Sequence, residues 1–170
     1  MSQNKVIIAL GTNVGNWKNN FNQAFININK LGHINNFSSI YVSKPYGYSN
    51  QNFFYNTAIE LLTLIEPNEL FKKLQLIEKK LKKEKLFKNG PRRIDLDIIF
   101  YNRIILKKNL LIIPHPRAHL RDFVLNPICE INPFFIHPIQ RKTIKELINK
   151  LRKSYILKKI IRQKNSVRIF

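Results

Sequence analysis

Two aspartates separated by a single residue, Asp95 and Asp97, are the clearest candidates for chemistry in this sequence. They lie in the stretch GPRRIDLDIIF, residues 90–100, and on a strand residues two apart share one face at about 6.5–7 Å. Neighbouring carboxylates repel each other unless a cation lies between them. Carboxylate oxygens suit Mg²⁺, a hard cation that also binds phosphates. The alternative is that Arg92 or Arg93 neutralises the pair in surface ion pairs.

A second group of reactive side chains lies in PHPRAHLRDF, residues 114–123, which holds two histidines, two arginines and a phenylalanine. Arginine forks match phosphate oxygens in bidentate fashion, and a histidine adds a further donor. The pattern indicates a phosphate-binding segment. The alternative is a proline-rigidified surface loop whose basic side chains are solvated.

A third candidate is the loop SKPYGYSNQN, residues 43–52, together with FFYN at 53–56. Rings stack on aromatic faces, and an amide both donates to and accepts from the edge of a heterocycle. The segment therefore favours a flat heteroaromatic ligand. The alternative is that these aromatics alternate into the core from a strand.

The elements that must position these groups follow from apolar periodicity and turn residues. We expect strands at Val6–Leu10, Ser39–Ser43, Tyr55–Leu64 and Ile94–Tyr101. One helix carries Trp17 to Leu31 and stops at Gly32, and a second begins at Glu66-Pro67. The order predicts an α+β sandwich with a ferredoxin-like βαββαβ core. One sheet would carry both helices on one face and leave the other free for a ligand.

The rest of the chain is less regular. Short extended pieces follow Tyr101, interrupted by prolines, and Thr143–Glu146 has the spacing of a capping box. This capping box predicts a C-terminal helix with Ile144, Leu147, Ile148 and Leu151 facing inward. Residues 152–170 have no clear period and receive no assignment. We expect one domain over residues 1–170.

The composition allows a packed core and points to a charged partner. The chain is 44% hydrophobic, and 30 Lys and Arg against 10 Asp and Glu give a net charge of +20. Such a field attracts nucleic acid, a membrane surface or a phosphorylated substrate, although a global bias toward lysine explains it as well. Without a signal peptide or a stretch of about 20 apolar residues, a cytoplasmic protein is expected. The single cysteine, Cys129, is interpreted as a small buried side chain.

Three stretches together carry a family resemblance: GPRRIDLDI at 90–98, IPHPR at 113–117 and RDFVLNP at 121–127. With ALGTN at 9–13 and Asn56, they resemble the 6-hydroxymethyl-7,8-dihydropterin pyrophosphokinases. The resemblance implies a ferredoxin-like enzyme of folate synthesis that acts alone as a monomer. Neither a membrane nor nucleic acid is expected as its partner. It transfers pyrophosphate from ATP to the pterin hydroxymethyl group and releases AMP.

The resemblance also implies roles for individual residues. Asp95 and Asp97 would hold two Mg²⁺ ions, and the pterin would stack between Phe54 and Phe123. The pterin edge would be read by Ser43, Asn56 and the backbone around Pro45, Tyr46 and Gly47. Residues matching the nucleotide pocket are Gln75, Ile98, Leu111 and Ile112, and those matching phosphate contacts are Arg92, His115 and Arg121.

Several positions depart from the family pattern. The loop before Gly90 commonly carries arginines and a tryptophan that close over the reactants, where this chain has Lys83, Lys85 and Asn89. Lysine keeps the charge but loses the planar fork, and Asn89 cannot stack. We therefore expect Lys83 and Lys85 to act in catalysis with weaker closure. A folded but catalytically poor relative is the alternative.

The same sandwich also serves RNA-binding modules, which would explain the charge directly. The sequence carries no aromatic-rich strand of the kind those modules use, and an aspartate pair on the ligand face repels phosphates unless a metal is bound. We therefore expect nucleic acid not to be the main partner.

Overall fold

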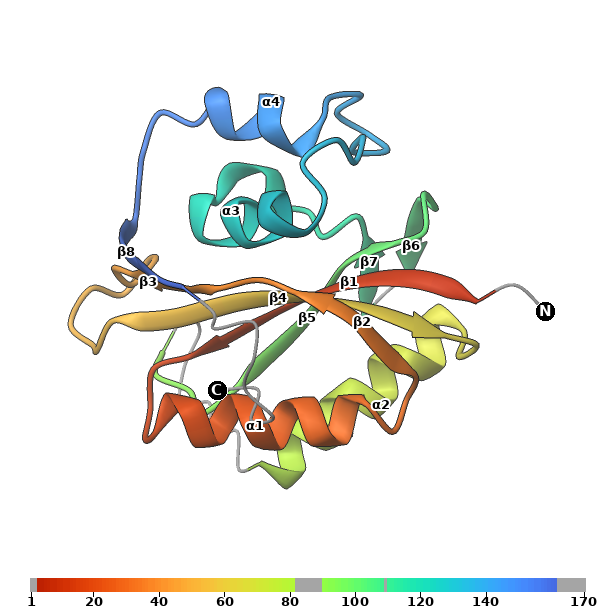
Figure 1. The fold of residues 1–170 in the computed structure, drawn as a ribbon, viewed down its shortest axis with the longest axis horizontal. Helices are drawn as coiled ribbons and strands as arrows, with labels where there is room; N and C mark the ends of the chain where they lie inside the picture. The colour runs from red at the N-terminus through yellow and green to blue at the C-terminus, as the bar shows by residue number, and fades with distance from the viewer. Residues whose placement is uncertain (1–2, 82–89, 109, 162–170) are drawn as a thin grey trace.

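The computed structural model describes residues 3–81, 90–108 and 110–161. These residues form three layers, in which a central sheet separates helices α1 (Trp17–Ile28) and α2 (Pro67–Lys80) from helices α3 (Asp122–Ile131) and α4 (Ile144–Asn149) (Figure 1). The sheet therefore has one face toward each helical layer.

The sheet has six strands: β1 (Asn4–Thr12), β2 (His33–Phe37), β3 (Ile40–Ser43), β4 (Phe54–Thr63), β5 (Asp95–Tyr101) and β8 (Ile156–Ile160). Their order is β5-β1-β4-β3-β8, with β2 also paired to β4. Each of these neighbouring pairs is antiparallel. β2 and β3 follow one another along β4 and together take the place of the second strand. The predicted ferredoxin-like core is confirmed.

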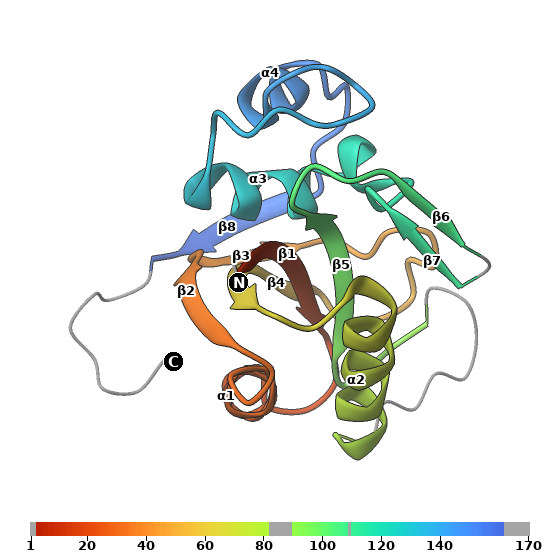
Figure 2. The ribbon, with the colours of Figure 1, turned by 90° about the vertical axis from the view of Figure 1, so that its right-hand side faces the viewer.

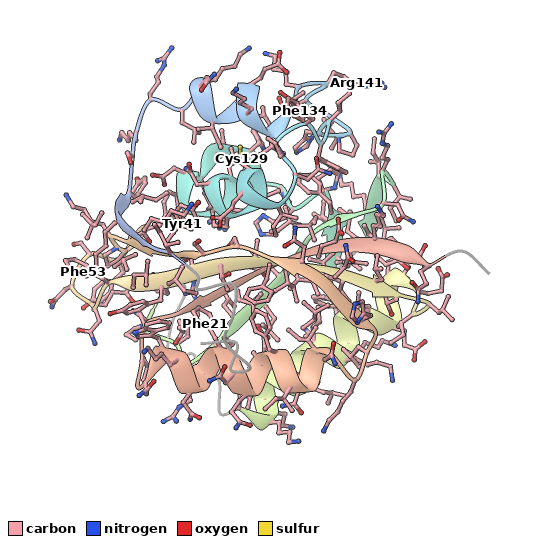
Figure 3. The ribbon with its side chains drawn as sticks, viewed as in Figure 1. Phe21, Tyr41, Phe53, Cys129, Phe134 and Arg141 are labelled. Carbon is pink, nitrogen blue, oxygen red and sulfur yellow. The ribbon has the colours of Figure 1, made fainter. Side chains whose placement is uncertain are left out.

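The first helical layer forms where the sequence predicts it. Asn16 caps α1 by accepting a hydrogen bond from the Asn19 backbone, and Pro67 opens α2, where its missing N–H costs nothing. The apolar stripes of both helices pack on β1, β4 and β5 in one continuous core. Figure 3 shows Phe21 in the space between α1 and the sheet. This layer fixes one face of β5, the strand that carries both aspartates.

The predicted end of α1 at Gly32 is wrong by one turn. The helix ends at Ile28 with Asn29 as its C-cap. Gly32 instead lies against β4, where a Cβ would collide with the Leu62 carbonyl oxygen. The glycine is therefore required by close backbone approach.

The opposite face of the sheet is covered in part, which corrects the prediction of a free face. Helix α3 and helix α4 pack their apolar side chains against Ile7, Ala58 and Phe100 in a second core. Residues 122–131 were predicted to be extended because of Pro127. This prediction is wrong, since Pro127 lies inside helix α3. The ligand face is therefore only the part of the sheet that α3 leaves open.

Other elements complete the fold. Strands β6 (Leu106–Lys108) and β7 (Leu111–Ile113) form a hairpin that lies beside β5 (Figure 2), and a 3₁₀ turn spans Ala118–Leu120. The capping box at Thr143 and Glu146 is present as predicted. Strand β8 was unassigned from sequence and pairs with the edge of β3. No helix in the described part of the chain has the length and apolarity that a membrane span needs.

Candidate active site

The floor of the candidate site is formed by paired residues of β1, β4 and β5. Gly11 on β1 is paired with Asn56 on β4 and with Asp95 on β5, and Ala9 is paired with Ala58 and Asp97. Paired residues in a sheet share a face, so both aspartates rise beside two very small residues. A cleft of about 300 Å³ lies above this floor. The small residues of β1 leave room between the acidic and the amide-bearing strands.

The acidic pair lies next to a cation. Arg92 Nε lies 3.0 Å from Asp95 Oδ2, and the Arg92 guanidinium lies 4.9 Å from the ring centroid of Phe54. The Arg92 backbone donates a 2.8 Å hydrogen bond to Asn13 Oδ1, and Asn13 N donates to the Arg92 carbonyl. The reciprocal contact holds Arg92 at the rim of the cleft. Asp95 thus forms an ion pair with Arg92, which the sequence offered as the alternative to a bound metal.

The segment after β7 brings a histidine to the same cleft. A cis peptide bond precedes Pro114, and His115 N donates to the carbonyl of Ile99 on β5. Burial, together with the positive charges of Arg121 and Arg117, lowers the pKa of His115 to about 4. The imidazole is therefore neutral near pH 7 and carries one N–H donor.

Arg121 lies over two aromatic rings. Its guanidinium carbon is 4.7 Å from the centroid of Tyr46 and 5.8 Å from that of Phe123. Burial lowers its pKa, as does Arg117, while Asp97 acts in the opposite direction. Arg121 Nε is buried and has no acceptor among the described residues. A buried guanidinium with an unsatisfied N–H next to carboxylates is suited to an anionic ligand.

The amide of Asn56 is fixed by its neighbours. Asn56 Nδ2 donates to the Tyr41 carbonyl at 3.1 Å and to Ser43 Oγ at 3.0 Å. Asn56 Oδ1 faces the position that a Cβ on Gly11 would take, at 3.5 Å from it. The oxygen is therefore turned toward the cleft, where it can accept a hydrogen bond from a ligand N–H.

The structure brings most of the predicted site residues together. Those that line the cleft are Ser43, Tyr46, Phe54, Asn56, Gln75, Arg92, Asp95, Asp97, His115, Arg121 and Phe123. Ile98 and Leu111 lie in the core beneath the helices, and Ile112 is exposed on β7. Pro45 lines a neighbouring hollow, and Gly47 has a positive φ in the adjoining loop. Lys83, Lys85 and Asn89 lie outside the described residues.

Sequence reasoning missed Glu78. Its side chain is buried, lines the cleft and accepts a 2.7 Å hydrogen bond at Oε1 from the Leu96 backbone N–H. This contact ties α2 to β5 between the two aspartates. A carboxylate next to Ile77 and in line with Leu74 on the apolar stripe of a helix was the available signal.

An antiparallel ferredoxin-like sandwich with an acidic pair, arginines and a neutral histidine in one cleft has the features of an enzyme of phosphoryl or pyrophosphoryl transfer. A family model described as 7,8-dihydro-6-hydroxymethylpterin-pyrophosphokinase matches residues 7–133. The chain belongs to this family. The sequence-based predictions of the family and of its pyrophosphoryl transfer in folate biosynthesis are confirmed.

Curated relatives support the assignment. The chain is 38% identical over 141 residues to the 2-amino-4-hydroxy-6-hydroxymethyldihydropteridine pyrophosphokinase of Aquifex aeolicus, covering 83% of this chain and 88% of the relative. The enzyme of the same name from Bacillus subtilis is 39% identical over 130 residues, with 75% and 78% covered. The folic acid synthesis protein FOL1 of Dictyostelium discoideum is 42% identical over 135 residues, 79% of this chain and 20% of that protein.

Solved structures share the fold. An HPPK-DHPS crystallised in complex with substrates superposes with a TM-score of 0.72 at 18% identity, covering 86% of this chain and 44% of that one. Wild-type Plasmodium falciparum HPPK-DHPS gives a TM-score of 0.69 at 19% identity, with 87% and 44% covered. The chain thus spans less than half the length of these structures.

Proposed function

We propose that this chain, acting as a single pyrophosphokinase domain, binds ATP and 6-hydroxymethyl-7,8-dihydropterin in the cleft above β1, β4 and β5. Family membership supports the reaction. The observation that carries the proposal is the strand register. Gly11 and Ala9 lie in the middle, with Asp95 and Asp97 on one side of them and Asn56 on the other side. A phosphate-metal subsite and a heterocycle subsite would then lie on one floor.

The donor set in the cleft fits Mg²⁺. Asp95 and Asp97 are two carboxylates on one face of one strand, and Mg²⁺ is usually held by one or two carboxylates plus substrate phosphates. We propose that this pair holds the ions, two in number. When bound, they supply charge stabilisation to the phosphate oxygens.

The side chains of the cleft would orient the two substrates. The pterin would lie against Phe54 and Phe123, with Asn56 Oδ1 accepting from its edge. Arg121 and the neutral His115 would donate to phosphate oxygens, and Arg92 would exchange Asp95 for a phosphate. The pterin hydroxymethyl oxygen would attack the β-phosphorus and give up its proton, while the bond from the β-phosphorus to the AMP oxygen breaks. Positioning and charge stabilisation would supply the rate.

AMP formation from ATP and 6-hydroxymethyl-7,8-dihydropterin with Mg²⁺ tests the proposal. Wild type should release AMP only when the pterin is present. Asp95→Ala and Asp97→Ala should each lower kcat by about a hundredfold or more, since each removes charge that holds the reacting groups. A folded wild type that binds Mg²⁺-ATP but forms no AMP would refute the reaction and favour the catalytically poor alternative.

A further inference from the structure

Asp122 is a buried carboxylate at the edge of the cleft, outside the set of residues that line it. It is the first residue of α3, between Arg121 and Phe123, and is 4% exposed. Its Oδ2 accepts hydrogen bonds from Ser154 Oγ at 2.9 Å, Tyr155 N at 2.6 Å and Ile156 N at 3.0 Å. A carboxylate is buried only where such donors compensate its lost hydration. Asp122 therefore fixes the backbone of residues 154–156 against the start of α3.

The same short segment is tied to the end of β3. Ile156 is paired with Ser43, and Lys44 N donates a 2.9 Å hydrogen bond to the Tyr155 carbonyl. Ser43 lies in the cleft and begins the loop that carries Tyr46. Residues 154–156 therefore join α3 to the loop on the heterocycle side of the cleft.

The ring of Tyr155 packs behind two residues that line the cleft. Its centroid lies 5.4 Å from that of Tyr46 and 6.0 Å from that of Phe123, in an edge-to-face arrangement with Phe123. Tyr46 and Phe123 lie 6.1 Å apart. Tyr155 itself faces the neighbouring hollow beside Pro45 and Phe53. Tyr155 thus supports the wall of the cleft from the side away from the ligand.

These contacts reach beyond the stretch that the family model matches, which ends at residue 133. We propose that Asp122 is a positioning residue, whose carboxylate holds residues 154–156 so that Tyr155 keeps Tyr46 and Phe123 in place for the pterin. The inference rests on the proposed function. It assigns to the C-terminal segment a part in pterin binding that the cleft residues alone do not reveal.

Glu130 provides a matched control on the same helix. It accepts hydrogen bonds from Ser39 and the Tyr41 hydroxyl and pairs with Lys159, so it also joins α3 to β3 and β8. It lies eight residues further along α3, about 12 Å from Asp122 along the helix axis. Removing the charge of Glu130 therefore perturbs α3, β3 and β8, but at a distance from Tyr46 and Phe123, which form the wall of the cleft.

The test compares Asp122→Asn, Tyr155→Ala and Glu130→Gln in the full chain, measuring the KM of each substrate, kcat for AMP formation and Tm. The amide in Asp122→Asn is a weaker, uncharged acceptor, and Tyr155→Ala removes the supporting ring. Because an aromatic pair contributes about 0.5–1.5 kcal/mol, the pterin KM should rise about threefold to tenfold in both. The ATP KM and kcat should stay within about twofold, and Glu130→Gln should lower Tm with the pterin KM unchanged.

Tyr155→Ala keeps the test valid where Asp122→Asn lowers Tm strongly, because the tyrosine is only half-buried. An unchanged pterin KM in Tyr155→Ala, or a rise equal to that in Glu130→Gln, would overturn the inference. A wild type without pterin-dependent AMP formation is a different result, which would overturn the proposed function and the inference together.

Discussion

Arg92 Nε lies 3.0 Å from Asp95 Oδ2 while its guanidinium lies over the ring of Phe54, 4.9 Å from the centroid. One side chain thus contacts both Asp95 and the aromatic side of the cleft. Because a guanidinium and a metal ion compete for the same carboxylate, the pair describes a resting arrangement that metal binding must change.

Replacing Arg92 by methionine should therefore separate metal binding from catalysis. Without the competing cation, the affinity of the nucleotide-free protein for Mn²⁺, measured by electron paramagnetic resonance, should rise severalfold. AMP formation should fall by about a hundredfold, since a donor to the transferring group is lost. The neighbouring Arg93 is exposed, so Arg93→Met should leave both quantities near wild type. A lower Mn²⁺ affinity in Arg92→Met would contradict this account.

Two glycines should respond to alanine in opposite ways. A Cβ on Gly11 would meet Asn56 Oδ1 at 3.5 Å and Phe54 at 4.0 Å, which are ordinary contacts, but it would occupy the floor of the cleft. Gly11→Ala should keep its Tm and raise the pterin KM about tenfold or more, because a methyl displaces ligand contacts. Gly32→Ala should lower Tm and leave KM unchanged, since its Cβ meets the Leu62 carbonyl. Equal losses of Tm would argue against a ligand above Gly11.

Arg121→Lys tests the geometry of the phosphate side. Lysine keeps the charge but loses the planar fork that lies over Tyr46 and Phe123. Charge-assisted hydrogen bonds contribute about 1.5–3 kcal/mol, so the ATP dissociation constant should rise about tenfold or more by calorimetry. Arg103 is exposed, and Arg103→Lys is the control. An unchanged ATP affinity in Arg121→Lys would show that charge alone suffices there.

Two histidines should make the free energy of unfolding depend on pH. Burial lowers the pKa of His115 and of His137 to about 4, from 6.5 in the unfolded chain. Between these values the unfolded chain binds more protons, so the free energy of unfolding should fall as pH drops from about 6.5 to 4 and stay level above about 7. Urea unfolding across this range measures it.

His137→Asn isolates the share of one histidine. His137 Nδ1 accepts from the Ile139 and Gln140 backbones at 3.2 Å, a role that an asparagine oxygen can fill without titrating. The slope between pH 6.5 and 4 should be smaller in this variant than in wild type. An identical slope would exclude His137 as a contributor.

The parts of the fold that were predictable are those in which local pattern and tertiary packing agree. The apolar run on β1, the stripe of α2 and the alternation around Asp95 each specify an element and its buried face. Both aspartates could therefore be placed on one surface from sequence. The residues facing them from other strands required register, which no single segment encodes.

The elements that were missed are those in which a local signal opposes the packing. Pro127 argues against a helix, yet α3 forms because Leu125 and Ile128 bury themselves on the sheet. The basic and apolar residues of β8 have no strand-like alternation, and the segment becomes a strand by pairing with the edge of β3. Glu78 was missed because the apolar stripe of α2, on which it lies, was interpreted as core packing alone. Tertiary context decided each of these cases.

The pairing of Ile156 with Ser43 also sets an order of assembly. The two residues are more than a hundred positions apart in sequence, and such distant contacts close late because the intervening chain must first be ordered. A ribosome delivers the chain from its N-terminus, so β1, α1 and β4 can dock well before residue 156 emerges. Once β5 has joined them the acidic floor is complete, whereas the aromatic wall closes only after residue 156 has emerged.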